Sequence, residues 1–121
     1  MRRWFAAAVL LISAVPTTSC TFSAEHINAQ VVLGSYAYVS HDPEQRHHDW
    51  DSLTLAKAGT YRFTRHGSDA EQKGVWKFSA SGNEGQPEIV LDTSGYPVQI
   101  RNGEVRLLID TDVGIWWAKV K

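Results

Sequence analysis

The sequence predicts a small all-β fold, an antiparallel β-barrel or a two-sheet sandwich of seven to eight strands, after a cleaved signal peptide. Beyond residue 30, apolar residues alternate with a period of two and no helical period of useful length appears. The connections between the alternating runs are too short for the crossovers that parallel neighbours need, so the strands are antiparallel. Asn102-Gly103 between two such runs predicts a tight hairpin. A closed barrel is the favoured architecture.

Eight runs are expected as strands, and apolar residues two apart within them share a face that points to the core. The runs are 31–39, 52–56, 60–66, 74–80, 87–93, 97–101, 104–110 and 115–121. The paired core residues are Leu53 with Leu55, Tyr61 with Phe63, Trp76 with Phe78, and Ile89 with Leu91. A Gly-x-aromatic pattern recurs at Gly34, Gly59, Gly74 and Gly114. It predicts a bend at each glycine and an aromatic side chain that fills the end of the core.

Residues 1–19 have the layout of a secretory signal peptide. Arg2 and Arg3 precede an apolar run at 4–15, and a proline and small residues follow. That run is shorter than the ~20 residues that a membrane-spanning helix needs. We expect residues 20–30 to form a tether and residues 31–121 to form a single domain.

Cys20, the only cysteine, stands at the expected cleavage site, in the stretch Thr17-Thr18-Ser19-Cys20. This stretch resembles the lipobox of bacterial lipoproteins, although Thr17 occupies a position where that family has Leu, Val or Ile. The resemblance implies lipidation of Cys20 and a periplasmic protein anchored to an inner or outer membrane of the bacterial envelope. The alternative is ordinary cleavage, which would leave a secreted or soluble periplasmic protein.

The stretches "LTLAKAGTY" and "GVW" resemble small lipocalin-like lipoproteins of bacterial envelopes, including the NlpE-type amino-terminal barrel. The resemblance implies a barrel fold over residues 31–121 and an envelope location. The Cys-x-x-Cys of that family is missing, so the resemblance does not extend to copper or thiol chemistry.

The charge pattern argues against two classes of partner. From residue 20 onward, thirteen acidic residues face ten Lys and Arg, which gives a net charge of −3. The two signs are interspersed along the chain and no basic stripe is present, which argues against nucleic acid and against electrostatic membrane binding. Membrane contact is expected through the lipid anchor only.

The segment "HDPEQRHHDWD" (41–51) is rich in side chains that bind zinc or copper. Its candidate ligands are His41, His47, His48 and Asp49. His47 and His48 are adjacent and would point to opposite faces of a strand, so one ion needs a bent loop. A solvated loop without metal is the favoured interpretation. A metal or small-ligand site, and a pH-sensing loop, are the alternatives.

Trp116 and Trp117 are neighbours, so one faces the core and the other faces out. We assign Trp116 to the core and Trp117 to the surface, as a candidate contact for a protein partner or as a residue covered by a loop. No motif for nucleophilic, metal-dependent or phosphate chemistry is present, so no enzyme and no cofactor are expected. The sequence therefore predicts a non-enzymatic, tethered protein-binding module of the immunity or accessory-subunit type, with a ligand- or metal-binding lipoprotein as the alternative.

Overall fold

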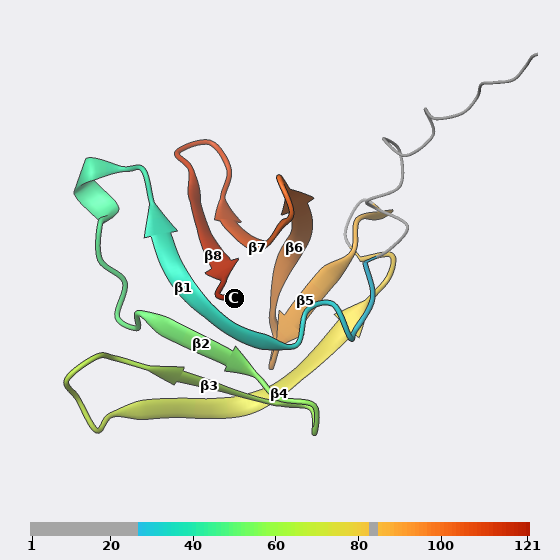
Figure 1. The fold of residues 1–121 in the computed structure, drawn as a ribbon, viewed down its shortest axis with the longest axis horizontal. Helices are drawn as coiled ribbons and strands as arrows, with labels where there is room; N and C mark the ends of the chain where they lie inside the picture. The colour runs from blue at the N-terminus through green and yellow to red at the C-terminus, as the bar shows by residue number, and fades with distance from the viewer. Residues whose placement is uncertain (1–26, 83–84) are drawn as a thin grey trace, which may run out of the picture.

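The computed structural model describes residues 27–82 and 85–121, which form a closed antiparallel barrel (Figure 1). Each strand pairs with the next along the chain, and β1 pairs with β8 to close the sheet. The strands are β1 (Gly34–Ser40), β2 (Ser52–Leu55), β3 (Thr60–Thr64), β4 (Glu71–Ser79), β5 (Glu88–Leu91), β6 (Ser94–Arg101), β7 (Glu104–Asp110) and β8 (Ile115–Lys119). The predicted fold class is confirmed.

The barrel interior is filled by the side chains that the alternation assigned to it. Leu53, Leu55, Tyr61, Phe63 and Ile89 are all buried. In an antiparallel pair, residues opposite each other share a face, and Leu53 lies opposite both Tyr36 and Phe63. This register stacks apolar side chains inward across neighbouring strands, and their burial is the main driving force for folding.

The Asn102-Gly103 hairpin forms as predicted. Arg101 and Glu104 face each other across β6 and β7, and φ is +53° at Asn102 and +79° at Gly103. Positive φ at both central residues is the requirement of the type I′ turn, whose twist matches that of the flanking strands.

Three strands begin three residues away from the start that the sequence indicated, and β5 begins one residue later than expected. β1 begins at Gly34 because residues 28–33 form turns, in which Val31 N donates to Asn28 O and Leu33 N to Gln30 O. β4 begins three residues early, at Glu71, where the polar stretch Glu71–Lys73 carries no apolar signal but pairs with β3. β6 begins at Ser94, with Pro97 inside the strand rather than at its start.

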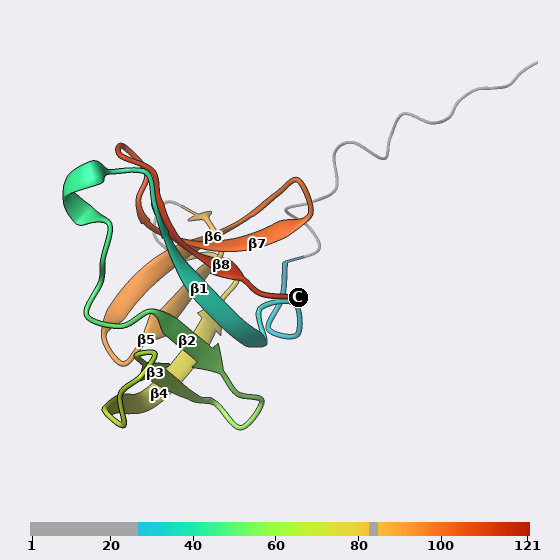
Figure 2. The same cartoon turned by 60° about the vertical axis from the view of Figure 1, so that its left-hand side comes forward.

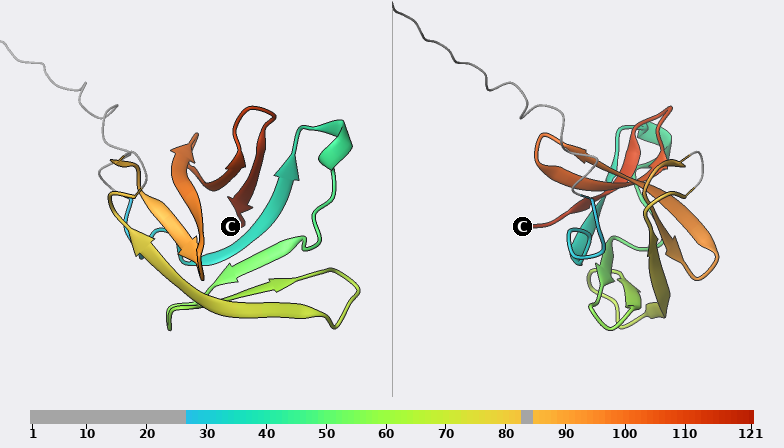
Figure 3. Two further views of the ribbon diagram at one scale, coloured as in Figure 1. Left: turned by 180° about the vertical axis from the view of Figure 1, so that it is seen from behind. Right: turned by 90° about the vertical axis from the view of Figure 1, so that its right-hand side faces the viewer.

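The barrel has two ends of different construction (Figure 2). The loop end is made of the connections at 41–51, 65–70, 92–93 and 111–114. The terminal end is made of residues 27–33, the connections at 56–59, 80–87 (83–84 outside the described residues) and 102–103, and residues 120–121. In the right-hand view of Figure 3, the C-terminus and the β6–β7 hairpin, both at the terminal end, lie on the left. Alternate connections lie at opposite ends because consecutive strands run in opposite directions.

Residues 27–33 close the terminal end of the core. Val32 is fully buried, and Tyr36 Oη donates to its carbonyl oxygen over 2.6 Å. Lys119 Nζ donates to the carbonyl oxygen of Val31 over 2.8 Å. Part of the predicted tether, residues 27–30, thus belongs to the folded unit. The expected signal peptide and Cys20 lie outside the described residues.

Candidate functional site

The loop of residues 41–51 is held by local hydrogen bonds. Asp42 caps the short helix η4 (Pro43–Gln45), and its Oδ1 accepts from Glu44 N over 2.9 Å. Tyr38 Oη donates to the carbonyl oxygen of Gln45 over 3.0 Å, which ties the loop to β1. An N-cap and a proline in the first helical turn are favourable for starting such a helix. The loop predicted from the charge density is therefore present and ordered by its own side chains.

The second half of this loop folds over the mouth of the barrel. The ring of His48 lies 5.1 Å from that of Tyr38 and 5.4 Å from that of Trp117, measured between centroids. Trp50 stacks on Phe63 at 6.2 Å, and the guanidinium of Arg65 lies 5.6 Å from the Trp50 ring. Aromatic pairs at these separations add about 0.5–1.5 kcal/mol each beyond burial. His48 and Trp50 thus cover the aromatic core at the loop end.

The candidate metal ligands are not brought together. His41 lies on the outer face of the barrel, while His48 lies over its mouth. The main-chain oxygen of Asp49 accepts from Arg65 Nε over 2.7 Å. In the described residues, no group of three His, Cys, Asp or Glu side chains is arranged to hold a metal ion. Metal binding by this loop stays the alternative interpretation.

The orientation predicted for the tryptophan pair is wrong. Trp117 is 1% exposed and lies in the core, whereas Trp116 is half-buried on the outer face. Trp117 pairs with Tyr38 on β1 and with the fully buried Leu107 on β7, so its side chain shares their inward face. Trp117 is therefore not available to a partner, and Trp116 takes its place as the candidate contact residue.

The pattern at Gly114 misled the prediction for a physical reason. Gly114 has a φ of +74° and belongs to the turn, so β8 begins at Ile115, which takes the first inward position. The pairing of β7 with β8 is also irregular between Leu108 and Asp110. The other three glycines precede buried aromatic residues, as expected: Tyr36, Tyr61 and Trp76.

Trp116 lies between the side chains of a histidine and an arginine. The His41 ring stacks on it at 5.1 Å between centroids, and Arg106 Cζ lies 4.2 Å from its ring centroid. These partners come from opposite sides of β8, because His41 follows β1 and Arg106 is on β7. Glu104 Oε1 accepts from Arg106 Nε over 2.7 Å and fixes the guanidinium. The indole is held as a sandwich and its two faces are occupied.

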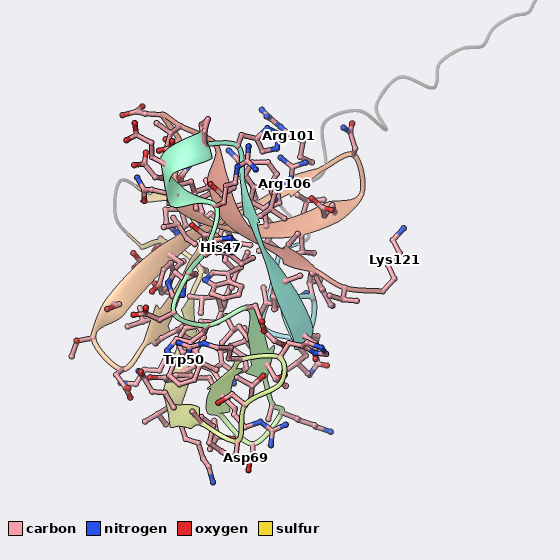
Figure 4. The ribbon with its side chains drawn as sticks, turned by 90° about the vertical axis from the view of Figure 1, so that its left-hand side faces the viewer. His47, Trp50, Asp69, Arg101, Arg106 and Lys121 are labelled. Carbon is pink, nitrogen blue, oxygen red and sulfur yellow. The ribbon has the colours of Figure 1, made fainter. Side chains whose placement is uncertain are left out.

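The indole N–H of Trp116 is buried and has no hydrogen-bond acceptor. Trp116 and Arg106 line a groove of about 270 Å³ together with Arg101, Gln99, Leu108 and Thr111. Arg101 and Arg106 lie on the same face of the barrel (Figure 4). A buried donor without an acceptor costs about 1–3 kcal/mol, and native proteins rarely keep one without cause. We refer to Trp116, Arg106 and His41 below as the Trp116 cluster.

A second polar cluster, around Asp92, is structural. Asp92 Oδ2 accepts from Tyr61 Oη over 2.6 Å and Oδ1 accepts from Val75 N over 3.1 Å. These hydrogen bonds, that from Tyr61 first, lower the pKa of Asp92, while burial and then the bond to Asp92 raise the pKa of Tyr61. Asp92 has a φ of +54°. The carboxylate thus joins the β5–β6 turn to β4 and β3, and the sequence carries no signal for it.

The fold and the cluster define a class: a small closed antiparallel β-barrel with a filled core and an aromatic–cationic cluster on its outer wall. Comparison with models of known families, with curated proteins and with solved structures gave no match. Within residues 27–82 and 85–121, no helix is both long enough and apolar enough to cross a membrane.

Proposed function

We propose that this protein is an exported, lipid-anchored and non-enzymatic protein-binding module of the bacterial envelope, and that it contacts its partner through the Trp116 cluster. The observation that carries the proposal is the half-buried Trp116, held between His41 and Arg106 with an indole N–H that lacks an acceptor. Tryptophan and arginine are the residue types most enriched at the energetic centres of protein interfaces.

The geometry favours a protein over a sugar or a nucleobase. Those ligands bind by stacking on an open aromatic face, and the two faces of Trp116 are already occupied by His41 and Arg106. What the groove offers is an edge: a buried N–H donor, the cation of Arg101 and the apolar side chain of Leu108. A carbonyl or carboxylate from a protein segment would satisfy the donor once the side chains that bury it move aside, and this would relieve its desolvation cost.

A ligand inside the barrel is disfavoured, because fully buried side chains occupy the middle of the core. Trp117, Tyr36, Leu53 and Leu107 are each at most 1% exposed. Lipocalin-like barrels that hold a ligand need room that these side chains take up. The small-ligand alternative therefore has no support from the interior.

The tether suits a partner that approaches from outside the membrane. The described chain begins at Ile27, at the terminal end, and Trp116 is the second residue of β8, next to the loop end. Ile27 comes seven positions after Cys20, a span of at most about 25 Å when extended. A lipid on Cys20 would keep the terminal end near the bilayer and turn the loop end away from it.

A photo-crosslinking experiment tests the binding site. A benzophenone amino acid replaces Gln99, which lines the groove, in the full chain expressed in its own cells. We expect one discrete adduct, and Trp116→Ala in the same chain should remove it. The matched control carries the crosslinker at Lys57, which is exposed at the terminal end. No adduct at Gln99, or the same adduct at both positions, would contradict the proposal.

A further inference from the structure

The fold sorts the charges that the sequence intersperses. The four connections of the loop end contain seven acidic residues and two basic ones, a net charge of −5. The described connections and chain ends of the terminal end contain two basic residues, Lys57 and Lys121, and no acidic one, a net charge of +2. Glu25 and Glu84 lie outside the described residues and are not counted. Because alternate connections go to opposite ends, charges that are neighbours in sequence become separated in space.

Cations at the terminal end are exposed. Lys57 lies in the β2–β3 turn, and Lys121 follows β8. Lys121 extends away from the loop that carries His47 and Trp50 (Figure 4).

Within the described residues, two acidic side chains lie at this end, and each is in contact with neighbouring residues. Glu104 is bonded to Arg106. Glu88, half-buried, packs against Gly82 and Gly95.

Two exposed valines sit among these cations. Val120 is 52% exposed and stands between Lys119 and Lys121. Val75 is 56% exposed and lies opposite Thr60, next to the β2–β3 turn. Lys73 and Lys77 lie two positions before and two positions after it on the same strand. A groove of about 390 Å³ runs beside Val120 and includes Val31 and Val105. Apolar side chains flanked by lysines suit the boundary between lipid headgroups and acyl chains.

From this arrangement we propose that the terminal end of the barrel docks directly on an anionic phospholipid surface. The occupant is argued from charge complementarity and from the path of the chain, since residues 27–33 enter the barrel at this same end. The orientation rests on the tether of the proposed function, whereas the contact itself needs no lipid on Cys20. It adds a second membrane contact to the single anchor expected from the sequence.

The net negative charge of the mature chain does not oppose this docking. The seven residues of β1 span roughly 23 Å at about 3.3 Å each, and a strand tilt of about 35–45° places the two ends about 16–19 Å apart along the barrel axis. The Debye length at physiological ionic strength is about 8 Å, so the acidic loop end is screened from a surface that touches the terminal end.

Vesicle sedimentation tests the proposal on the unlipidated chain of residues 20–121 with Cys20→Ser. All pairings that close the barrel lie within residues 34–119, and circular dichroism verifies the fold of each variant. We expect binding to vesicles of phosphatidylglycerol and phosphatidylethanolamine, weakened by salt, and no binding to phosphatidylcholine. Each cation removed near the surface should lower the partition coefficient about fivefold. Lys57→Glu and Lys121→Glu each change the charge by two units, so each should lower the partition coefficient about 25-fold, and together they should abolish binding.

Arg46→Glu is the matched control, because it changes the net charge by the same amount at the loop end. It should leave the partition coefficient unchanged. Equal loss in Arg46→Glu, equal binding to neutral vesicles, or no binding to anionic vesicles at low salt would each overturn the proposal. Retention on a soluble polyanion without vesicle binding would overturn it as well. The crosslink from Gln99 is measured in a separate experiment, so one proposal can fail while the other holds.

Discussion

The neighbouring tryptophans of β8 provide the sharpest test of the structure, because the same substitution at adjacent positions should have very different costs. Trp117 is 1% exposed, and its ring contacts those of Tyr38, His48 and Phe63 at 5.4–5.6 Å between centroids. A buried tryptophan removes about 150–250 Å² from water. At about 25 cal/mol per Å² this corresponds to about 4–6 kcal/mol.

Trp117→Ala should therefore lower the free energy of unfolding by about 3–5 kcal/mol, the range seen for large aromatic residues in cores. That is a large part of the ~5–15 kcal/mol that a small domain has in total. Trp116→Ala should cost about 1–2 kcal/mol, since the side chain is half-buried and its main specific contact is the cation–π pair with Arg106.

Urea unfolding followed by circular dichroism measures both values on the chain of residues 20–121. Trp117→Phe serves as a milder variant if Trp117→Ala does not fold. For each kcal/mol lost from the free energy of unfolding, the melting temperature of a domain this size should fall by about 4–8 °C. A larger loss for Trp116→Ala than for Trp117→Ala would refute the assignment of inner and outer faces, and with it the Trp116 cluster.

Two further predictions concern Tyr36 and the histidine-rich loop. Burial raises the pKa of Tyr36, so its neutral phenol contributes stability that is complete below the unfolded pKa of about 10 and is lost as the pH rises above it. Tyr36→Phe loses the hydrogen bond to the Val32 carbonyl oxygen and should lower the free energy of unfolding by about 1–2 kcal/mol at neutral pH. It should also reduce the loss of stability at alkaline pH, and an unchanged loss above pH ~10 would contradict this account. Zn²⁺ is expected to leave the melting temperature unchanged, because the structure keeps His41 and His48 on different faces. A rise that His47→Ala with His48→Ala abolishes would show that expectation to be wrong.

Local signals were sufficient for most of the fold. The alternation of Leu53 with Leu55 and of Ile89 with Leu91 identified inward faces, since a strand with one buried face must repeat with a period of two. Asn102-Gly103 identified a turn because few residue pairs tolerate positive φ twice. Strand starts without apolar residues, such as Glu71, gave no signal, because their pairing depends on a neighbouring strand rather than on their own side chains.

The candidate site depended on non-local geometry and was largely missed. Trp116 faces outward because Trp117 pairs with Leu107 and Tyr38, residues ten and seventy-nine positions away in sequence. A register worked out from the Asn102-Gly103 hairpin would have placed Leu107 inward, but the irregularity near Asp110 would still have obscured β8. The charge separation between the ends likewise follows from topology and cannot be read from spacing along the chain.

Closure of the barrel by β1 and β8 limits how this molecule can be recognised. Each of the eight strands in the described chain has a neighbour on both sides. Main-chain groups on a free strand are what a visiting peptide uses to extend a sheet, and what drives uncontrolled association between copies. Here no described strand is a free edge over its whole length, which restricts that mode to short stretches such as Lys77–Ser79, which pair with β5 but not with β3. A partner of this protein would therefore be selected mainly by side chains on the wall, and these can be substituted without removing the main-chain hydrogen bonds between strands.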